Sequence, residues 1–347
     1  MQKLDRIVYL DFLKLISIIG VIIIHVTSIG YLESDINSTY IISVAYNSLF
    51  RWSVPIFFMV SGCLFLRKNK EINFSIMLKK YIPKLIIALV IFGAIYSLLD
   101  MYIYNSFSIK GLIMIVWNVF SNNTGYHLWF LYALISIYLM IPVFRLIVSN
   151  LTQKQLLFVI LVWMILSLLP NQFNSLMSSM NLNLGFDWYC SILCSWGGYV
   201  LLGYYLNEYG FKTGIERLIV IFGLCSLLVC AGLNIFFTLN KDAVFDAFTL
   251  PNGLTTCFAA TSIFLLFKNL KISQNVKCYI SKIGQDVYGI YLIHVLINSL
   301  IFKIFNLDLD FIPAILSIPI FTAFEFIISI IIVEVITLIK PLRKILK

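Results

Sequence analysis

Residues 9–30 read YLDFLKLISIIGVIIIHVTSIG, an apolar run long enough to cross a bilayer as one α-helix. Lys14 and His25 lie inside it, and eleven residues of helix return a side chain to within about 20° of its starting direction. The two side chains therefore share one helix face, roughly 16 Å apart along the axis. Because a lysine near the middle of a membrane helix costs about 2.5–3.5 kcal/mol on insertion scales, this polar stripe predicts a chemical role.

The apolar character extends over the rest of the chain. Of its 347 residues, 61% are hydrophobic and 12% are charged, and the mean hydropathy is +0.97. These values predict an all-α integral membrane protein with about ten transmembrane helices, formed by one membrane domain over residues 1–347 without a cleavable leader or an appended soluble domain. The expected spans are residues 9–30, 42–66, 81–104, 127–149, 155–170, 189–208, 216–238, 252–269, 285–305 and 312–338.

Lysine and arginine are unevenly distributed among the connections between these spans. One alternate set of connections holds nearly all of them, whereas the other set holds only Lys110, Lys241 and Lys303. The positive-inside rule then predicts that both termini are cytoplasmic. This bias accounts for most of the net charge of +9, so the expected partner is the lipid bilayer and no nucleic acid is expected.

Two further features bear on the connections and on metals. Residues 111–120 (GLIMIVWNVF) are apolar but too short to span, which predicts an interfacial or re-entrant helix. We expect the seven cysteines to be reduced, since they form no CxxC pair, and we expect no metal site. They stand at positions 63, 190, 194, 225, 230, 257 and 278.

The chain has only three histidines, His25, His127 and His294, and each lies at an expected span. Histidine transfers protons near neutral pH, and ionisable residues at membrane depth tend to line functional cavities. Interhelical hydrogen bonding is the alternative role for each of them. Aromatic residues surround His127, and both an interfacial aromatic belt and a platform for sugars account for Trp129 and Tyr132.

Other charged residues fall inside spans. Arg51 opens the segment RWSVPIFFMVSG (residues 51–62), where its guanidinium suits a phosphate or carboxylate, or alternatively lipid headgroups. Pro55 and the pair Ser61–Gly62 would loosen this helix and admit a ligand or another backbone. Glu325, in the last span, is expected to have a supporting role and to pair with a cation such as Lys14 or Arg51.

Four blocks of the sequence, in this order and spacing, resemble the bacterial acyltransferase-3 family of integral membrane O-acyltransferases. Among its subgroups the chain looks most like the enterobacterial-common-antigen O-acetyltransferase type. The likeness covers essentially the whole chain. The blocks are Arg6-x4-Asp11-x2-Lys14-x10-His25, RWSVPIFFMVSG at 51–62, HLWFLYALISIYLMIP at 127–142 and YGIYLIH at 288–294.

The resemblance implies a multi-pass protein of the bacterial cytoplasmic membrane that moves an acyl group, usually acetyl, from cytoplasmic acyl-CoA to a glycan hydroxyl. Acyl-CoA would be a donor substrate and not a permanently bound cofactor. The acceptor would be a cell-surface polysaccharide or its lipid-linked precursor.

The resemblance also carries roles to particular residues. The family's essential Arg-x10-His motif falls on Lys14 and His25, so this chain keeps the charge and loses the bidentate fork. Its arginine before the PxFFxxSG run falls on Arg51. The catalytic set is then His25 as general base with Lys14 and Arg51. Residues expected to bind or orient substrate are Asp11, Ser61, His127, Trp129, Tyr132, Tyr288, Tyr291, His294 and Glu325.

Two other classes of function fit buried cations and histidines. One is a transporter or exporter of a glycan precursor or small metabolite, and the other is a non-catalytic membrane scaffold. Consumption of acyl-CoA separates the enzyme from both. The sequence leaves the acyl group, the acceptor and the oligomeric state open, with a homodimer among the alternatives. It also leaves open the role of Glu325 and whether transfer is direct or passes through a covalent acetyl-His25 intermediate.

Overall fold

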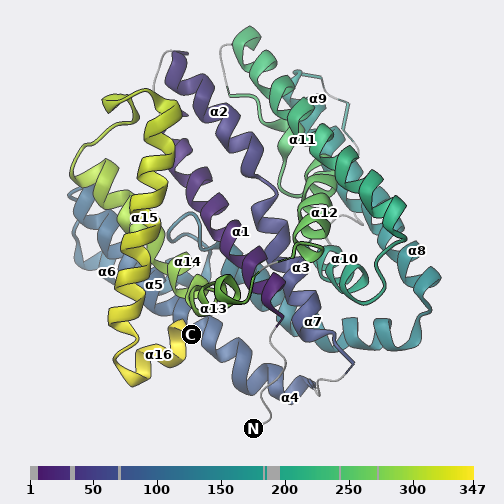
Figure 1. The fold of residues 1–347 in the computed structure, drawn as a ribbon. Helices are drawn as coiled ribbons and strands as arrows, with labels where there is room; N and C mark the ends of the chain where they lie inside the picture. Colours follow the sequence, from purple (N-terminus) through teal and green to yellow (C-terminus); the bar gives the residue numbers. More distant parts are fainter. Residues whose placement is uncertain are drawn as a thin grey trace.

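The computed structural model describes residues 7–31, 36–68, 72–182, 184–185, 196–241, 244–271 and 273–347. Within these ranges the chain consists of helices and connecting turns, with no β-strand, so the predicted all-α class is confirmed (Figure 1). Eight helical segments in these ranges are long and apolar enough to cross a membrane. They are Val8–Gly30, Ser38–Phe65, Phe74–Ile103, Trp129–Asn150, Gln153–Ser179, Thr213–Asn240, Val287–Ile304 and Ala314–Ile336.

The two other expected spans contain shorter helices. The one expected at 252–269 holds an apolar helix of 15 residues, Leu254–Lys268, and the one expected at 189–208 holds the helix Gly197–Glu208. Residues 186–195, with Cys190 and Cys194, lie outside the described residues, as does Arg6. The expected span at 155–170 is longer than predicted, because the helix continues to Ser179 through a π-helical turn, Met164–Leu168, that ends just before Pro170.

The α-helices are named in chain order, as in Figure 1. They are α1 (Val8–Thr27), α2 (Ser38–Phe50), α3 (Ser53–Phe65), α4 (Phe74–Ile76), α5 (Ile82–Ile103), α6 (Ile109–Phe120), α7 (Trp129–Asn150), α8 (Gln153–Trp163), α9 (Leu169–Ser179), α10 (Gly197–Glu208), α11 (Thr213–Lys241), α12 (Leu254–Lys268), α13 (Gln274–Ile283), α14 (Val287–Ser299), α15 (Ala314–Ile336) and α16 (Lys340–Leu346). Single π-helical turns join α4 to α5 and α8 to α9, and another follows α14.

Helix α1 lies at the centre of the bundle. It packs against α2, α3, α12, α13, α14 and α15, and Figure 1 shows it between α15 on one side and α12 on the other. Leu13, Ile18 and Ile22 on α1 have no exposed surface. The helix that carries Lys14 and His25 is therefore fixed on several sides by its neighbours.

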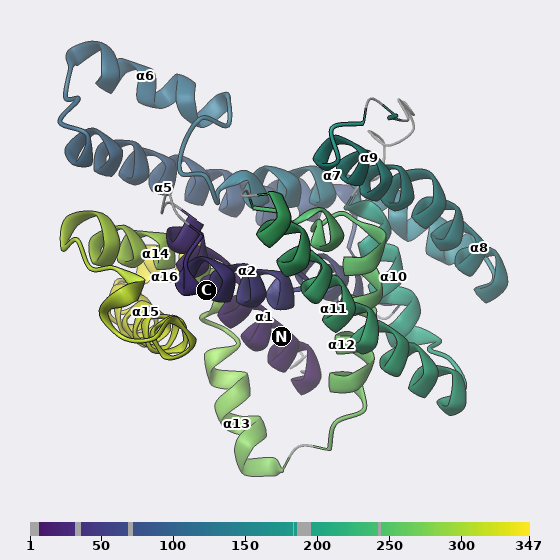
Figure 2. The ribbon, with the colours of Figure 1, turned by 90° about the horizontal axis from the view of Figure 1, so that it is seen from above.

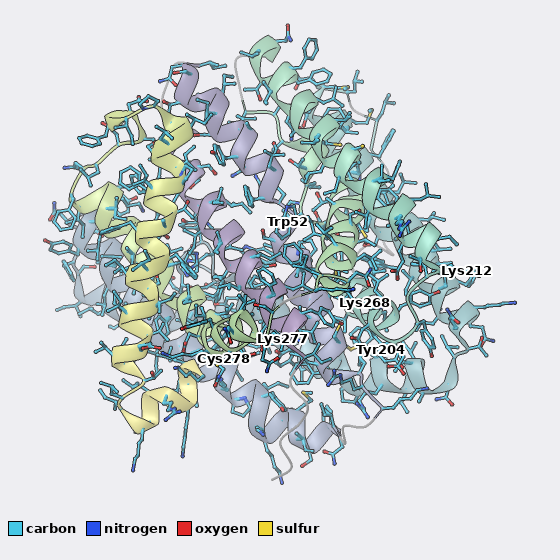
Figure 3. The ribbon with its side chains drawn as sticks, viewed as in Figure 1. Trp52, Tyr204, Lys212, Lys268, Lys277 and Cys278 are labelled. Carbon is cyan, nitrogen blue, oxygen red and sulfur yellow. The ribbon has the colours of Figure 1, made fainter. Side chains whose placement is uncertain are left out.

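The span at Ser38–Phe65 is broken in the middle at Arg51 and Trp52, which separate α2 from α3. Trp52 lies near mid-height of the bundle (Figure 3). The indole N–H of Trp52 donates to Leu49 O at 2.8 Å, which satisfies a carbonyl freed by the break. The break places Arg51 well inside the bundle's height, as the sequence predicts.

Close packing of α3 on α10 depends on two glycines. A side chain at Gly62 would collide with the carbonyl of Val200, and one at Gly203 would collide with the carbonyl of Met59. The predicted role of the Ser61–Gly62 pair is thus confirmed in one of its two forms, since Gly62 admits another backbone.

Helix α6 lies on the outside of α5, away from the rest of the bundle (Figure 2). It forms because Ser108 caps its first turn, with Oγ accepting from the N–H of Gly111 at 3.0 Å. Its apolar side chains are largely exposed, including Ile109 at 80% and Phe120 at 74%. A short helix at 111–120 is confirmed, and its interfacial position stays a prediction.

Candidate active site

Lys14 and His25 lie on the same helix, as predicted, near opposite ends of α1. The Lys14 Nζ is 2.7 Å from Asp11 Oδ1, one turn earlier, and donates to the carbonyl oxygen of Gly284 at 3.0 Å. Gly284 directly follows α13 and packs against Asp11 so closely that a Cβ there would collide with it. The ammonium group is therefore held in place by a buried carboxylate and a backbone carbonyl.

The three histidines of the chain, which come from three separate helical regions, meet in the bundle. The ring centroid of His25 is 5.2 Å from that of His294 and 6.2 Å from that of His127, and the His127 and His294 centroids are 5.5 Å apart. His127 and His294 are buried, whereas His25 is partly exposed. We call this group the histidine cluster.

Hydrogen bonds to the backbone hold the histidine cluster together. The Nδ1 of His294 lies 2.7 Å from the carbonyl oxygen of Tyr291, and the Tyr291 hydroxyl donates to the carbonyl oxygen of His127 at 2.7 Å. The hydroxyl of Tyr96, which the sequence analysis did not select, donates to Leu292 O at 2.9 Å while its ring contacts His127. These bonds connect α5, the turn before α7 and α14.

Several imidazole nitrogens of the cluster are buried without a hydrogen-bond partner among the described residues. They are both ring nitrogens of His127 and the Nε2 of His294. Buried polar atoms are nearly always hydrogen-bonded in native proteins, so unpaired ones call for a functional explanation. No group of three or more His, Cys, Asp or Glu side chains in the described parts of the chain is arranged to hold a metal ion. Polar atoms of a substrate or ordered water molecules are the partners that such nitrogens require.

A small cavity of about 30 Å³ adjoins the histidine cluster. We call it the outer cavity. His25, His127 and Trp129 contribute to its lining, so three residues selected from the sequence do meet around one space. Its full lining is Val21, His25, Val54, Phe57, His127, Trp129, Phe130 and Tyr291.

A second cavity of about 370 Å³ lies nearer the Lys14 end of α1, and we call it the inner cavity. Lys14, Lys84 and Lys347 line it, together with Ser61 and Tyr288 from the predicted set. The Nζ of Lys84 lies 5.1 Å from the centroid of the Tyr288 ring. The inner cavity is within the size range of small-ligand sites and combines apolar walls with three cations.

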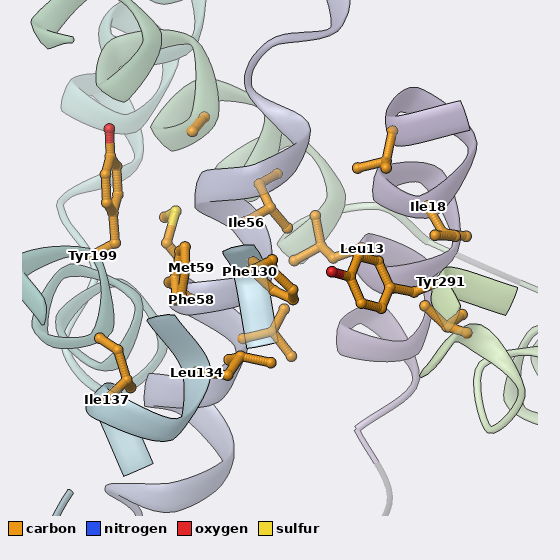
Figure 4. Close-up of a cluster of buried hydrophobic side chains, with 14 of the residues drawn as sticks. Leu13, Ile18, Ile56, Phe58, Met59, Phe130, Leu134, Ile137, Tyr199 and Tyr291 are labelled. Carbon is orange, nitrogen blue, oxygen red and sulfur yellow. The ribbon is translucent and has the colours of Figure 1, made fainter. Parts of the chain in front are cut away.

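The two cavities share a wall made of three aromatic side chains, Phe57, Phe130 and Tyr291. The Phe130 centroid lies 5.7 Å from that of Phe57 and 5.3 Å from that of Tyr291. Figure 4 shows the Tyr291 and Phe130 rings between Ile18 on one side and Phe58 on the other. The cationic inner cavity and the histidine cluster thus adjoin across the thickness of one layer of rings.

Arg51 is paired with an acid that sequence reasoning missed. Its Nη2 lies 3.1 Å from Asp246 Oδ2, in the segment that follows α11. Its Nε is buried without a hydrogen-bond partner among the described residues. The two residues are 195 positions apart, and no spacing in the sequence indicates such a pair.

Glu325 does not pair with Lys14 or Arg51, whose carboxylate partners are Asp11 and Asp246. The Glu325 carboxylate is fully buried and accepts from the Nδ2 of Asn298 at 3.3 Å. Asn298 follows His294 by four residues, so the two side chains occupy neighbouring positions on one face of α14. Glu325, on α15, thus contacts α14 one helical turn after His294.

Two other predicted residues make local contacts. Tyr132 donates its hydroxyl to the carbonyl of Val119 and so ties α7 to α6, away from both cavities. The Ser61 hydroxyl donates to the carbonyl of Phe57 one turn earlier, at 3.0 Å. Tyr126 instead lies at the cluster, with its ring centroid 5.1 Å from that of His25.

The model of a protein family described as an acyltransferase domain matches residues 7–334. The chain belongs to the acyltransferase-3 family. Comparisons with curated proteins and with solved structures gave no match. The match covers α1 through most of α15, so every cavity residue named above except Lys347 falls inside the family region of this membrane acyltransferase.

Proposed function

We propose that this acyltransferase moves an acetyl or other acyl group from cytoplasmic acyl-CoA to a hydroxyl of a bacterial cell-surface polysaccharide or its lipid-linked precursor. More narrowly, the protein is proposed to be an O-acetyltransferase of the enterobacterial-common-antigen type that lies in the bacterial cytoplasmic membrane. His25 is the proposed general base. The observation that carries the proposal is the adjacency of a cationic cavity and a histidine cluster across one aromatic wall.

The donor is proposed to bind at the inner cavity. Phosphate groups of coenzyme A need cations, and Lys84 is the proposed one. Lys14 and Lys347 also line the cavity, where they are paired with Asp11 and Asp286 at 2.7 and 2.6 Å. The volume of about 370 Å³ and the largely apolar lining suit an extended pantetheine arm. The thioester at the end of that arm would reach the aromatic wall, next to His25.

The proposed reaction needs one base and one electrophile. His25 takes the proton of the acceptor hydroxyl, the hydroxyl oxygen attacks the thioester carbon, and the C–S bond breaks. The imidazolium then returns its proton to the coenzyme A thiolate. His25 is favoured for this role over the other histidines because it is partly exposed and lines the outer cavity, whereas His294 is fully buried and its Nδ1 already faces a backbone carbonyl.

The tyrosine that stabilises the thioester oxyanion is proposed to be Tyr126. Tyr291 is a poorer choice because its hydroxyl already donates to the His127 carbonyl. The Tyr126 ring contacts that of His25. Oxyanion stabilisation requires a donor aimed at the developing charge.

The proposed orientation of the protein in the membrane rests on the positions of its lysines. Lys212, Lys268 and Lys277 lie in the lower half of the bundle (Figure 3), the end at which α1 begins and α16 lies (Figure 1). By the positive-inside rule this end is cytoplasmic, as are both termini. The Lys14 end of α1 then faces the donor compartment, and the His25 end faces the acceptor.

The proposal is tested with purified protein in lipid, labelled acetyl-CoA and a bacterial glycan extract. We expect thiol release and acetyl transfer by the wild type, a loss of about 10²–10⁴-fold in His25→Ala, and retained transfer in Lys14→Arg. Lys212→Ala, which removes an exposed cation at the same end, is the control and should be unchanged. Full activity of a folded His25→Ala protein would contradict the role of His25, and failure of the wild type to consume acyl-CoA with any acceptor fraction would reject the enzyme in favour of transport.

A further inference from the structure

The outer cavity is far smaller than any complete substrate of the proposed reaction. Its volume is about 30 Å³, whereas one water-sized probe needs roughly 10–15 Å³. Neither a sugar ring nor a pantetheine arm fits such a space. Two or three heavy atoms do fit, and an acetyl group has three.

The lining of the outer cavity divides into fixed rings and two aliphatic side chains. Phe57, Phe130 and Tyr291 form the wall toward the inner cavity and hold one another through ring contacts. Trp129 packs against Trp196, with centroids 5.4 Å apart. These contacts leave the rings little room to yield to a larger group.

Val21 and Val54 are the two aliphatic members of the lining. Val21 is buried on α1 and precedes His25 by four residues, so its side chain lies on the same helix face as the imidazole, one turn closer to Lys14. Val54 lies at the start of α3, directly after the break at Arg51 and Trp52. Two β-branched side chains from different helices thus face one small space next to the proposed base.

We propose that Val21 and Val54 set the length of the acyl group that this protein transfers, and that they limit it to acetyl. The inference rests on the proposed function and names the residues that select its acyl group. The methyl group of the donor occupies the outer cavity beside His25, the thioester lies at the aromatic wall, and the pantetheine arm stays in the inner cavity. Each further methylene or carboxylate, as in butyryl or succinyl groups, collides with the valines.

The test compares acetyl-CoA with butyryl-CoA as donors for the wild type, Val54→Ala and Val21→Ala, with kcat/KM measured for each. A hydrophobic pocket discriminates by about 10–200-fold for each methylene, so we expect the wild type to prefer acetyl-CoA by at least about 10-fold. Either alanine variant should reduce this preference by about 10-fold, because it removes two methyl groups from the lining. Val143→Ala, on the exposed face of α7 (43% exposed), is the matched control and should keep the wild-type ratio.

A narrowing variant keeps the proposal testable if an alanine variant does not fold. Val54→Ile adds one methylene to the cavity and should lower acetyl-CoA use while the unfolding temperature stays within a few degrees of wild type. Equal use of acetyl- and butyryl-CoA by the wild type, or an unchanged ratio in the folded Val54 and Val21 variants, would overturn the inference and leave the acyltransferase proposal standing. A wild type that uses neither donor would overturn both.

Discussion

Removal of the Tyr291 hydroxyl tests whether the histidine cluster depends on its backbone hydrogen bonds. In Tyr291→Phe the ring stays in the aromatic wall, and only the 2.7 Å bond to the carbonyl oxygen of His127 is lost. Both residues are buried, with exposed fractions of 6% and 2%. The substitution therefore leaves the buried carbonyl with only the longer bond from the Phe130 N–H, at 3.4 Å, and does not open a cavity.

The magnitude follows from that burial. An intramolecular hydrogen bond contributes about 0.5–1.5 kcal/mol net, and hydrogen bonds between membrane helices average about 0.6 kcal/mol. Because the carbonyl keeps its longer bond, we expect Tyr291→Phe to lower the free energy of unfolding by about 0.5–1.5 kcal/mol. It should also lower kcat for acyl transfer, because the His127 ring is no longer held against His25, and leave the KM for the donor unchanged, because the inner cavity keeps its lining.

The assay is unfolding in detergent, followed by kinetics with the proposed donor. Tyr46→Phe is the matched control, since its hydroxyl also donates to a carbonyl on another helix, Ile315 O at 3.1 Å, but at an exposed position. The control should change the free energy of unfolding by less than about 0.5 kcal/mol. Equal losses of stability in the two variants, or an unchanged kcat in Tyr291→Phe, would show that the histidine cluster does not depend on this hydrogen bond.

Three shorter predictions concern other parts of the structure. Gly62→Ala should separate α3 from α10, because its Cβ would meet the Val200 carbonyl. The variant should unfold at least 2–3 °C below the wild type in a thermal scan, since about 1 kcal/mol shifts the unfolding temperature of a chain of this size by roughly that much. An unchanged unfolding temperature would contradict this packing. Asp246→Ala should impair acyl transfer more than it impairs expression, because it leaves the partly buried Arg51 charge uncompensated. Asp246→Glu should keep the transfer activity, since it keeps the carboxylate. Equal transfer by the wild type and both variants would argue against a role for the Arg51–Asp246 pair. Lys84→Ala should raise the KM for the donor several-fold at unchanged kcat, measured by thiol release, and a fall in kcat alone would place Lys84 outside donor binding.

The all-α class and the shared helix face of Lys14 and His25 can be predicted from the sequence, because both are properties of single helices. Spacing alone put Lys14 and His25 on one face of α1, since helical periodicity needs no knowledge of neighbours. The charge bias and span lengths likewise belong to individual segments. Pro170 shows the limit of such reasoning, because a proline ends a helix only where the backbone before it cannot adjust, and here a π-helical turn precedes it.

Contacts between distant segments could not be predicted in this way. The meeting of His25, His127 and His294 depends on how α1, α7 and α14 pack, and a single sequence gives no pairing between them. Glu325 was assigned a cation as its partner on electrostatic grounds, yet packing places the Asn298 amide against it.

Transfer across the membrane is tested with sealed vesicles in which the Lys14 end of the protein faces outward and a glycan acceptor is enclosed in the lumen. Labelled acetyl-CoA is added outside, and label on the enclosed acceptor is followed for wild type and His25→Ala. If His25 catalyses transfer across the membrane, the wild type places label on the lumenal acceptor while coenzyme A thiol is released outside, and His25→Ala does neither. Label that reaches the acceptor equally well without His25, or only when acceptor is supplied on the donor side, would contradict it.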